Sequence, residues 1–410
     1  PDMYPPDATC ERQWLEERDR LHGLLHQGKR ILLHCRGGLG RTGTVAARML
    51  VEFGVNPQQA IDMVRAARTG TIETPDQKRH VLHYRPPALR RTLPYFAGCL
   101  LGGAVGDALG WPVEFDSIEE IRSTFGDAGI KDPVPNGEGL FEITDDTQMT
   151  LFSAEGLLRA ATRAHRKGIG PSFASCGHYA CRRWMVTQGE LDSHDVCCDG
   201  WLVNVQPLHN RRAPGGTCLA ALRQQRRGSV EAPLNDSKGC GAVMRMAPAG
   251  LFFQSPYALG FLNDEQRDSY TFRTGCELGA LTHGHASGYL SAACLALLIG
   301  RIIGGDDLET ALDRTCAMLT TCDGHSETLQ ALDAARALAA DPAVTPSPQV
   351  LTRLGEGWVG EEALAIGVYC ALVAKDDFAF GVRLAVNHGG DSDSTGAIAG
   401  NLLGALLREE

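Results

Sequence analysis

The sequence predicts a multidomain protein with a large all-α part at residues 95–410 and a smaller part at residues 1–85 that combines a buried strand with helices. A chain of 410 residues exceeds what a single core usually organises. Residues 30–35 form a short apolar run that ends in a glycine-rich turn, as a buried strand before a loop does. After a proline- and arginine-rich linker at residues 86–94, strand patterns nearly vanish and helical periodicity recurs.

The predicted strand of the smaller part leads into helices. Residues 44–53 form a helical stretch that Gly54 ends. A second helix is expected over residues 57–68, with Asn56 as its N-cap. A third is expected over residues 75–84.

The larger part has the pattern of an all-α domain. Glycine and alanine are frequent inside its helical segments, and such small residues let helices approach closely. We expect helices at residues 95–109, 147–163, 275–303, 308–319, 326–339, 361–373, 378–386 and 395–407.

The composition is that of a soluble globular protein, with 43% apolar and 21% charged residues. A net charge of -10 argues against general nucleic-acid binding, which needs a basic face. The longest apolar run, residues 289–300, is too short to span a bilayer, so we expect a buried helix and no membrane partner. The 14 cysteines form no CxxC pair and no signal peptide is evident, which favours a reducing, cytoplasmic setting.

A Cys-x5-Arg loop, with Cys35 and Arg41 at its ends, follows the predicted strand. Successive backbone N–H groups in a tight loop before a helix form an anion site, which the glycines let the backbone approach. Arg41 can grip phosphoryl oxygens in a fork, and the same positive field would make Cys35 a nucleophilic thiolate. The alternative is a buried strand-end cysteine without chemistry. The predicted phosphate-binding residues are Arg36, Gly37, Gly38, Leu39, Gly40, Arg41 and Thr42.

This stretch resembles the signature loop of tyrosine and dual-specificity phosphatases, and the resemblance extends over about residues 2–84. It implies that the smaller part is the C-terminal part of an α/β cysteine-phosphatase fold. It also implies that Asp2 is the general acid and that Gln77 positions the attacking water. A phosphorylated substrate would then be hydrolysed through a Cys35 phosphoenzyme.

Two acidic clusters, residues 144–147 and 389–395, lie far apart in the sequence, each before a predicted helix. Together they would offer oxygen ligands only, which suits Mg²⁺ or Mn²⁺ rather than zinc. Four unpaired carboxylates would repel one another, and a pair of divalent cations about 3.5–4 Å apart would relieve this. For either cluster alone, simple N-capping is the alternative. The sequence therefore predicts that both clusters share one pocket.

Four blocks in order resemble the ADP-ribosylglycohydrolases: residues 98–110 followed by Glu114, then 144–149, 237–245 and 389–396. The resemblance implies the all-α fold of that family. It also implies a site with two Mg²⁺, or Mn²⁺ in their place. The implied metal ligands are Thr144, Asp145, Asp146, Asp391, Asp393 and Ser394.

The same resemblance implies roles for other residues. Glu114, Asp145 and Asp146 would share the activation of water, whose attack on the distal ribose expels a modified side chain, commonly arginine. The partner would be an ADP-ribosylated protein or a small ADP-ribose derivative. His283 is expected on the substrate side; its alternative is a histidine satisfied within the helical core. The segment expected to face the ribose and pyrophosphate is Ser237, Lys238, Gly239, Cys240 and Gly241.

Three hypotheses follow from these motifs. The first is a bifunctional hydrolase that removes ADP-ribose and phosphate. The second is a phosphatase whose helical part is inert or only binds ADP-ribose. The third is a structural relative without catalysis, which would have lost metal ligands, and none is lost here. The leaving group stays open between arginine, serine, a nucleobase and O-acetyl-ADP-ribose.

Overall fold

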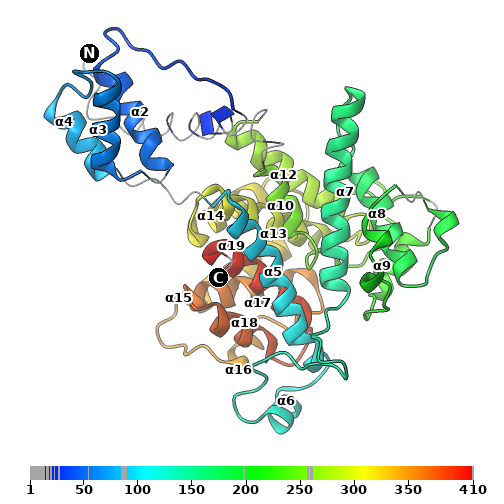
Figure 1. Ribbon diagram of the computed structural model, residues 1–410. Coiled ribbons are helices and arrows are strands. Elements are labelled where there is room, and N and C mark those ends of the chain that lie inside the picture. Colours follow the sequence, from blue (N-terminus) through cyan, green and yellow to red (C-terminus); the bar gives the residue numbers. More distant parts are fainter. Residues whose placement is uncertain are drawn as a thin grey trace. The chain divides into compact units, whose positions relative to one another are not determined.

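The computed structural model describes residues 14, 18, 21–22, 24–25, 28–53, 55–84, 90–196, 199–224, 226–255, 258 and 262–408 (Figure 1). The chain divides into two compact units. The smaller unit comprises residues 1–89 and 256–265, and the larger unit comprises residues 90–255 and 266–410.

The smaller unit contains helices α2 (Gly40–Glu52), α3 (Pro57–Ala67) and α4 (Pro75–His83). The predicted cap of the second helix is confirmed, because the Asn56 side chain accepts a hydrogen bond from the backbone N–H of Gln58 at 3.0 Å. The three helices pack around one apolar cluster: Ala47, Val51, Ala60, Ile61, Ile72, Val81 and Tyr84.

The strand predicted for residues 30–35 is wrong for the structure described, where these residues are irregular. A strand requires a neighbour that completes its hydrogen-bond ladder, and no described segment pairs with this one. The following helix begins at Gly40 rather than 44, since Leu39 already has helical backbone angles and accepts from the N–H of Gly43 at 3.2 Å. Asp2 lies outside the described residues.

Among the described residues of the larger unit, helices are the only regular secondary structure apart from two isolated bridges, and loops connect them, which confirms the all-α prediction. Two predicted helices have the bounds observed, and most others differ by one to three residues at an end. The helices are α5 (Leu93–Gly110), α6 (Ile118–Phe125), α7 (Asp145–Lys167), α8 (Phe173–Thr187), α9 (Gly216–Leu222), α10 (Ala247–Phe253), α12 (Asp264–Gly279), α13 (Ala286–Gly304), α14 (Leu308–Leu319), α15 (Ser326–Ala340), α16 (Pro348–Leu351), α17 (Gly360–Ala374), α18 (Phe378–Val386) and α19 (Ser392–Leu407).

The single helix predicted over residues 275–303 is wrong, since α12 and α13 are separated by a turn. The His285 side chain caps α13 by accepting from the N–H of Ser287 at 3.2 Å. A Cβ on Gly284 would lie 2.0 Å from the Asn235 carbonyl oxygen, so the turn packs tightly against a neighbouring loop. Local turn chemistry therefore overrides a continuous apolar pattern.

Helices α5 and α19 cross with their backbones in direct contact, and glycines make this possible. A Cβ on Gly102 would lie 2.3 Å from the carbonyl oxygen of Gly400, and a Cβ on Gly106 would lie 2.0 Å from that of Gly396. A Cβ on Gly404 would lie 1.9 Å from the carbonyl oxygen of Gly98. Any side chain at these positions would force the helices apart. The contact holds the end of α5 against the start of α19, where the second acidic cluster lies.

Two helices of the larger unit are long and apolar enough, by length and composition, to cross a membrane: residues 93–113 and residues 286–304. The second contains the apolar run that the sequence suggested was too short to span. Its apolar window is 89% buried, and the core helix of a folded domain meets the same criterion. The expectation of a buried helix is confirmed.

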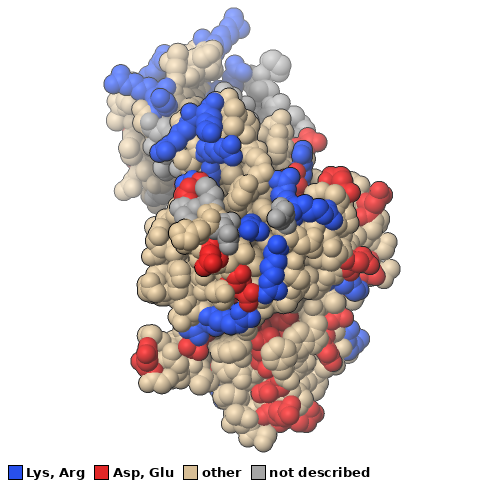
Figure 2. Space-filling model, turned by 90° about the vertical axis from the view of Figure 1, so that its right-hand side faces the viewer, with Lys and Arg blue, Asp and Glu red and all other residues tan. Residues whose placement is uncertain are grey.

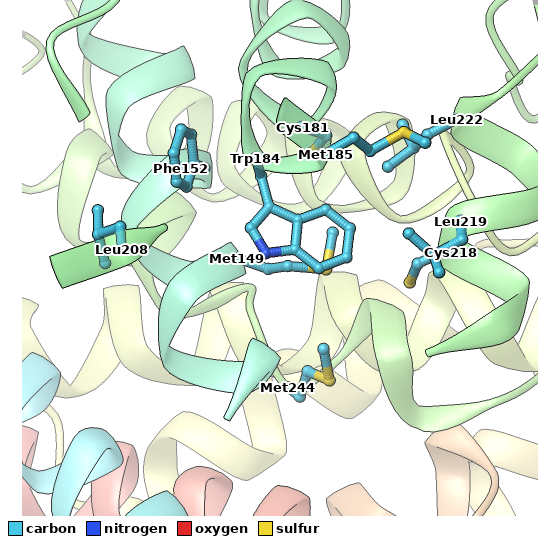
Figure 3. Close-up of a cluster of buried hydrophobic side chains, with 10 residues drawn as sticks. All are labelled: Met149, Phe152, Cys181, Trp184, Met185, Leu208, Cys218, Leu219, Leu222 and Met244. Carbon is cyan, nitrogen blue, oxygen red and sulfur yellow. The ribbon is translucent and has the colours of Figure 1, made fainter. Parts of the chain in front are cut away.

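A cluster of buried side chains joins α7, α8 and α9, with the Trp184 indole in its middle (Figure 3). The indole N–H donates to Gln148 Oε1 at 3.1 Å, and Gln148 Nε2 donates to the Asn210 carbonyl at 3.2 Å. Met149 joins the cluster one turn after the first acidic pair. The cluster therefore fixes the N-terminal turn of α7.

Candidate active site

The two acidic clusters share one cavity of about 390 Å³ in the larger unit, which we call the acidic pocket. This is the convergence that the sequence predicts. The residues lining it are Glu114, Phe115, Asp145, Asp146, Ala213, Pro214, Gly215, Gly216, Thr217, Cys218, Gly239, Cys240, Gly241, Met244, His283, Trp358, Asp391, Asp393 and Ser394.

The first acidic cluster forms the first turn of α7. Thr144 is the N-cap, and its hydroxyl oxygen accepts from the N–H of Asp146 at 3.2 Å. Asp145 and Asp146 lie inside the helix, not before it as expected, because the Thr144 cap starts the helix two residues early. Asp145 Oδ2 accepts from the N–H of Gly215 at 3.1 Å, whereas Asp146 Oδ1 has no hydrogen-bond partner. The helix dipole favours negative charge at this end.

Asp107 supports this turn from α5, a role that sequence reasoning did not assign. Its carboxylate accepts from the N–H groups of Thr144 at 2.9 Å and Thr147 at 3.1 Å, and from the Thr147 hydroxyl at 2.5 Å. Burial raises the pKa of Asp107 to about 6, against the opposing effect of these hydrogen bonds. The signal in the sequence is a lone carboxylate inside the apolar, glycine-rich helix of residues 98–110.

The second acidic cluster starts α19. Asp391 is the N-cap and accepts from the N–H of Ser394 at 3.2 Å, while Asp393 lies in the first turn rather than in an irregular loop. A Cβ on Gly390 would lie 2.1 Å from the Glu356 carbonyl oxygen, and the residue has φ of +157°. Only glycine fits this approach. The cap and the glycine together turn both carboxylates into the pocket.

The buried carboxylates destabilise one another's charge. Burial, then the carboxylates of Asp107 and Asp391, raises the pKa of Asp145 to about 8. Burial, then the charges of Asp391 and Asp145, raises the pKa of Glu114 to about 8. Burial and neighbouring carboxylates also raise the pKa values of Asp146 and Asp393 far above their usual range. Taking up positive charge in the pocket would reverse these shifts.

The donor set fits hard divalent cations. It offers carboxylate and hydroxyl oxygens in a buried site, and Asp146 Oδ1 and Glu114 Oε2 have no hydrogen-bond partner. Among the described residues, no group of three or more His, Cys, Asp or Glu side chains already has the arrangement of a complete metal site. The carboxylates would therefore have to draw together around a cation, with the hydroxyls of Thr144 and Ser394 as additional ligands.

Glu114 follows the short helical turn Trp111–Val113 and lines the pocket beside an aromatic pair. Phe115 has φ of +73°, unusual for a large side chain, and 71% of it is exposed. Its ring stacks on Trp358 with centroids 5.1 Å apart. These rings give the acidic pocket an apolar wall next to the carboxylates.

The segment 237–241 contributes only part of what the sequence predicts. Gly239, Cys240 and Gly241 line the pocket, but Ser237 and Lys238 do not. Lys238 Nζ pairs with Glu361 at 2.6 Å and Glu327 at 2.9 Å. The N–H groups of Gly239 and Cys240 already donate within the fold, at 3.3 Å to Ser237 Oγ and 3.1 Å to the Trp358 carbonyl. The Cys240 thiol donates to Asp391 Oδ2 at 2.6 Å.

His283 lines the pocket although it is only 2% exposed. Its Nδ1 lies 2.9 Å from the Thr282 hydroxyl, which accepts from Arg245 at 2.7 Å. Burial, then the Arg245 charge, lowers the pKa of His283 to about 3, so the ring is neutral. His283 is therefore held within the helical core and lines the pocket, while its role towards the substrate stays a prediction.

The Cys35 loop of the smaller unit turns before α2. The N–H of Gly38 donates to Cys35 Sγ at 3.1 Å, and Gly38 has φ of +71°. Hydrogen bonding by the Thr42 hydroxyl and backbone, then the N–H groups of Gly38 and Gly37, lowers the pKa of Cys35 to about 7. Arg36 and Arg41 are exposed at this loop.

Two further residues flank the loop. Gln77, predicted to position water, is buried beside Gly40 and completes a capping box with Thr74 at the start of α4. Arg68 donates to the Gly37 carbonyl at 3.4 Å, a contact that the sequence did not indicate. Both side chains place polar groups against the backbone of the Cys35 loop.

A sequence model of the ADP-ribosylglycohydrolase family matches residues 89–410. The chain belongs to this family. The chain is 27% identical over 319 residues to the ADP-ribosyl-(dinitrogen reductase) glycohydrolase of Rhodospirillum rubrum, covering 75% of this chain and 84% of that protein. It is 26% identical over 329 residues to the uncharacterized Escherichia coli protein YegU, covering 75% and 86%. A solved structure titled ADP-ribosylglycohydrolase-related protein complex aligns with a TM-score of 0.45 at 22% identity, over 78% of this chain and 89% of that one.

The N-terminal region of this ADP-ribosylglycohydrolase family member matches a second model, the Swiss Army Knife protein, DSP-PTPase phosphatase domain, over residues 13–81. Cyclin-dependent kinase inhibitor 3 of Sus scrofa is 39% identical over 89 residues, which are 21% of this chain and 40% of that protein. A probable protein tyrosine phosphatase type IVA B of Dictyostelium discoideum is 36% identical over 77 residues, which are 18% of this chain and 45% of that protein. The chain thus fuses a phosphatase domain to an ADP-ribosylglycohydrolase domain, and both indicate a hydrolase.

Proposed function

We propose that the larger unit hydrolyses, with Mg²⁺, the N- or O-glycosidic bond of ADP-ribosylated substrates, with ADP-ribosyl-arginine as the expected substrate. The observation that carries this proposal is the meeting of Asp145, Asp146, Asp391 and Asp393 in the acidic pocket. The name of the Rhodospirillum rubrum relative supports an ADP-ribosylated protein as partner. Mn²⁺ is the alternative ion, because it accepts the same oxygen ligands.

The side chains of Asp145, Asp146, Asp391, Asp393 and Ser394 line the pocket and would hold the two cations, together with the hydroxyl of Thr144, which caps α7 but does not line the pocket. The cations would supply positive charge to orient ribose hydroxyls. Side chains of the pocket would move the proton and exclude water. Glu114 has a buried oxygen without a partner, and it can accept a proton from water once positive charge in the pocket reverses the rise in its pKa. Phe115 and Trp358 offer an apolar wall that excludes water from one side of the ligand.

The smaller unit, we further propose, hydrolyses phosphoesters. The Cys35 thiolate would attack phosphorus and displace the alcohol of the ester, while loop N–H groups and Arg41 hold the phosphoryl oxygens. Water would then break the sulfur–phosphorus bond and release phosphate. The lowered pKa of Cys35 supports this role. Asp2 as general acid and Gln77 as the residue that positions water remain predictions from the sequence.

The competing function is a phosphatase whose helical domain is inert or only binds ADP-ribose. One assay separates the two. The chain is incubated with ADP-ribosyl-arginine and, separately, with a phenyl phosphate ester, each with and without EDTA. The proposal predicts ADP-ribose release that EDTA stops and that Asp393→Ala abolishes. The matched control Asp376→Ala removes an exposed aspartate outside the pocket and keeps the activity. Phosphate release that Cys35→Ser abolishes, without any ADP-ribose release, would establish the competing function.

A further inference from the structure

A second cavity, of about 510 Å³, lies between the C-terminal half of α7 and helix α8. Figure 2 looks onto the side of the molecule that carries these helices and shows patches of Lys and Arg there, with patches of Asp and Glu between and below them. We call it the basic cavity. It is lined by Arg159, Thr162, Arg163, Arg166, Lys167, Cys176, Tyr179, Arg183 and Asp199.

Two of its cations are already neutralised. Arg183 is buried and donates to Glu155 Oε2 at 2.9 and 2.5 Å and to Asp199 at 3.1 Å. Arg159 pairs with the same Asp199. The pair of Arg183 with Glu155 joins α8 to α7, and the pairs with Asp199 join both helices to the loop that contains this residue. Asp199 is the one carboxylate among the described residues that line the cavity.

Three cations remain. Within the part of the chain that the structure describes, Arg163, Arg166 and Lys167 form no ion pair, and all three are exposed at the cavity. The helix dipole explains some cations in the last turn of α7, but Arg163 lies one turn farther back. The helix dipole also does not explain why these cations line a cavity. In a chain with net charge -10, concentrated positive charge in a concave site indicates an anionic ligand.

The volume of the basic cavity and the tyrosine that lines it indicate which class of anionic ligand could bind there. Pockets for small organic ligands usually measure about 300–1,000 Å³, so the basic cavity has room for a nucleotide. Tyr179 lines it and is 50% exposed, which leaves ring surface for a planar base. Arginines grip phosphate oxygens in a fork.

We propose that the basic cavity binds a nucleoside diphosphate, with Arg163, Arg166 and Lys167 on the phosphates and Tyr179 against the base. This site is separate from the acidic pocket. Asp146 and Arg163 stand on the same helix, roughly 25 Å apart at 1.5 Å rise per residue. The inference does not depend on the proposed hydrolase activity.

The test is calorimetric titration of the full chain with ADP, pyrophosphate and adenosine. EDTA removes divalent cations from the acidic pocket, and an Arg41→Ala background weakens phosphate binding at the Cys35 loop. We expect one ADP bound per chain. The double variant R163A/R166A should weaken the binding of ADP and of pyrophosphate by at least about tenfold, because both ligands lose charge-assisted hydrogen bonds to the two arginines. Tyr179→Ala should weaken the binding of ADP and leave the affinity for pyrophosphate unchanged, because pyrophosphate has no base.

The matched control is the double variant K131A/R353A, which removes two exposed cations of the larger unit outside the cavity. It should bind ADP like the parent. Alanine suits exposed helical positions, so R163A/R166A should keep the parent's circular dichroism spectrum. Absence of ADP binding, equal losses in both double variants, or loss of ADP binding in Asp393→Ala instead would overturn the proposal. Binding of an acidic polypeptide without ADP would also overturn it and indicate a protein contact.

Discussion

At the scale of single residues, Cys35 shows how a few backbone N–H groups and one hydroxyl change a side chain's chemistry. Its thiol is not deeply buried, yet Thr42, Gly38 and Gly37 lower its pKa to about 7. A lower pKa means more thiolate at neutral pH, and thiolate is the reactive form.

The first prediction concerns the pH dependence of this thiol. The rate of Cys35 alkylation by iodoacetamide should rise as the pH increases and reach half its maximum at about pH 7. In Thr42→Ala the midpoint should move to higher pH, because the substitution removes the hydroxyl that contributes most to the lowered pKa of Cys35. Mass spectrometry of the peptide with Cys35 measures the rate, and Cys35→Ser is the blank. An identical midpoint in both proteins would refute the assigned cause.

The second prediction separates metal binding from proton transfer. Glu114→Gln should lower kcat for ADP-ribose release by about 10²–10⁴, the usual contribution of a general base. The rise in Tm on adding Mg²⁺ should persist, because the aspartates remain. Calorimetry and initial rates measure the two effects. If the Mg²⁺ shift disappears while kcat with saturating metal is normal, Glu114 serves as a ligand instead.

At the scale of helices, the site depends on two contacts that set where α7, α5 and α19 begin and end. Glycines let α5 and α19 touch backbone to backbone, and the cluster around Trp184 fixes the first turn of α7 (Figure 3). Both contacts lie within a few residues of acidic side chains.

The third prediction tests the glycine contact. In Gly106→Ala the new Cβ would lie 2.0 Å from the Gly396 carbonyl oxygen, so the helices must separate. We expect a loss of stability of about 1–3 kcal/mol, as for overpacking, together with loss of ADP-ribose release. Gly137→Ala is the matched control, because nothing lies within 4 Å of its Cβ. Urea unfolding of both variants measures the difference; equal midpoints would show that the helices accommodate a methyl group there.

The fourth prediction tests the Trp184 cluster. Trp184→Ala should cost about 3–5 kcal/mol, because it leaves a large cavity and removes the partner of Gln148. Trp201→Ala, at a tryptophan that is 48% exposed, should cost less than about 1 kcal/mol. Denaturant unfolding gives both values. A small loss in Trp184→Ala would mean that the cluster does not anchor α7.

Much of this architecture could be predicted from local patterns. Periodic apolar residues predicted α14 and α18 with the bounds observed, and the acids at 145–146 and 391–393 predicted a shared pocket. Helices α6, α8, α9, α10 and α16 were not predicted. The sequence also could not show that Lys238 would pair with Glu361 or that Asp107 would cap α7, because both contacts join segments distant along the chain.

At the scale of the whole molecule, two sites of different chemistry lie in two separate units of one chain. The acidic pocket offers oxygen ligands, and the Cys35 loop offers N–H groups and a thiol. Neither site uses a described residue of the other unit.

The fifth prediction follows from this separation. Cys35→Ser should abolish phosphate release and leave ADP-ribose release within about twofold of the parent, because the two sites share no described residue and independent sites act additively. Asp393→Ala should abolish ADP-ribose release and leave phosphate release within about twofold of the parent. Both variants are measured in both assays at one protein concentration. If Cys35→Ser also reduces ADP-ribose release strongly, the two units are coupled.

The claim on which the hydrolase assignment depends is that the first turns of α7 and α19 bind the same cations. Crystals grown with Mn²⁺ and measured at the manganese absorption edge locate those ions directly. The account predicts anomalous peaks in the acidic pocket, within coordination distance of Asp146 and of Asp391 or Asp393, and about 3.5–4 Å apart. A well-ordered pocket without such peaks at saturating Mn²⁺ would contradict it.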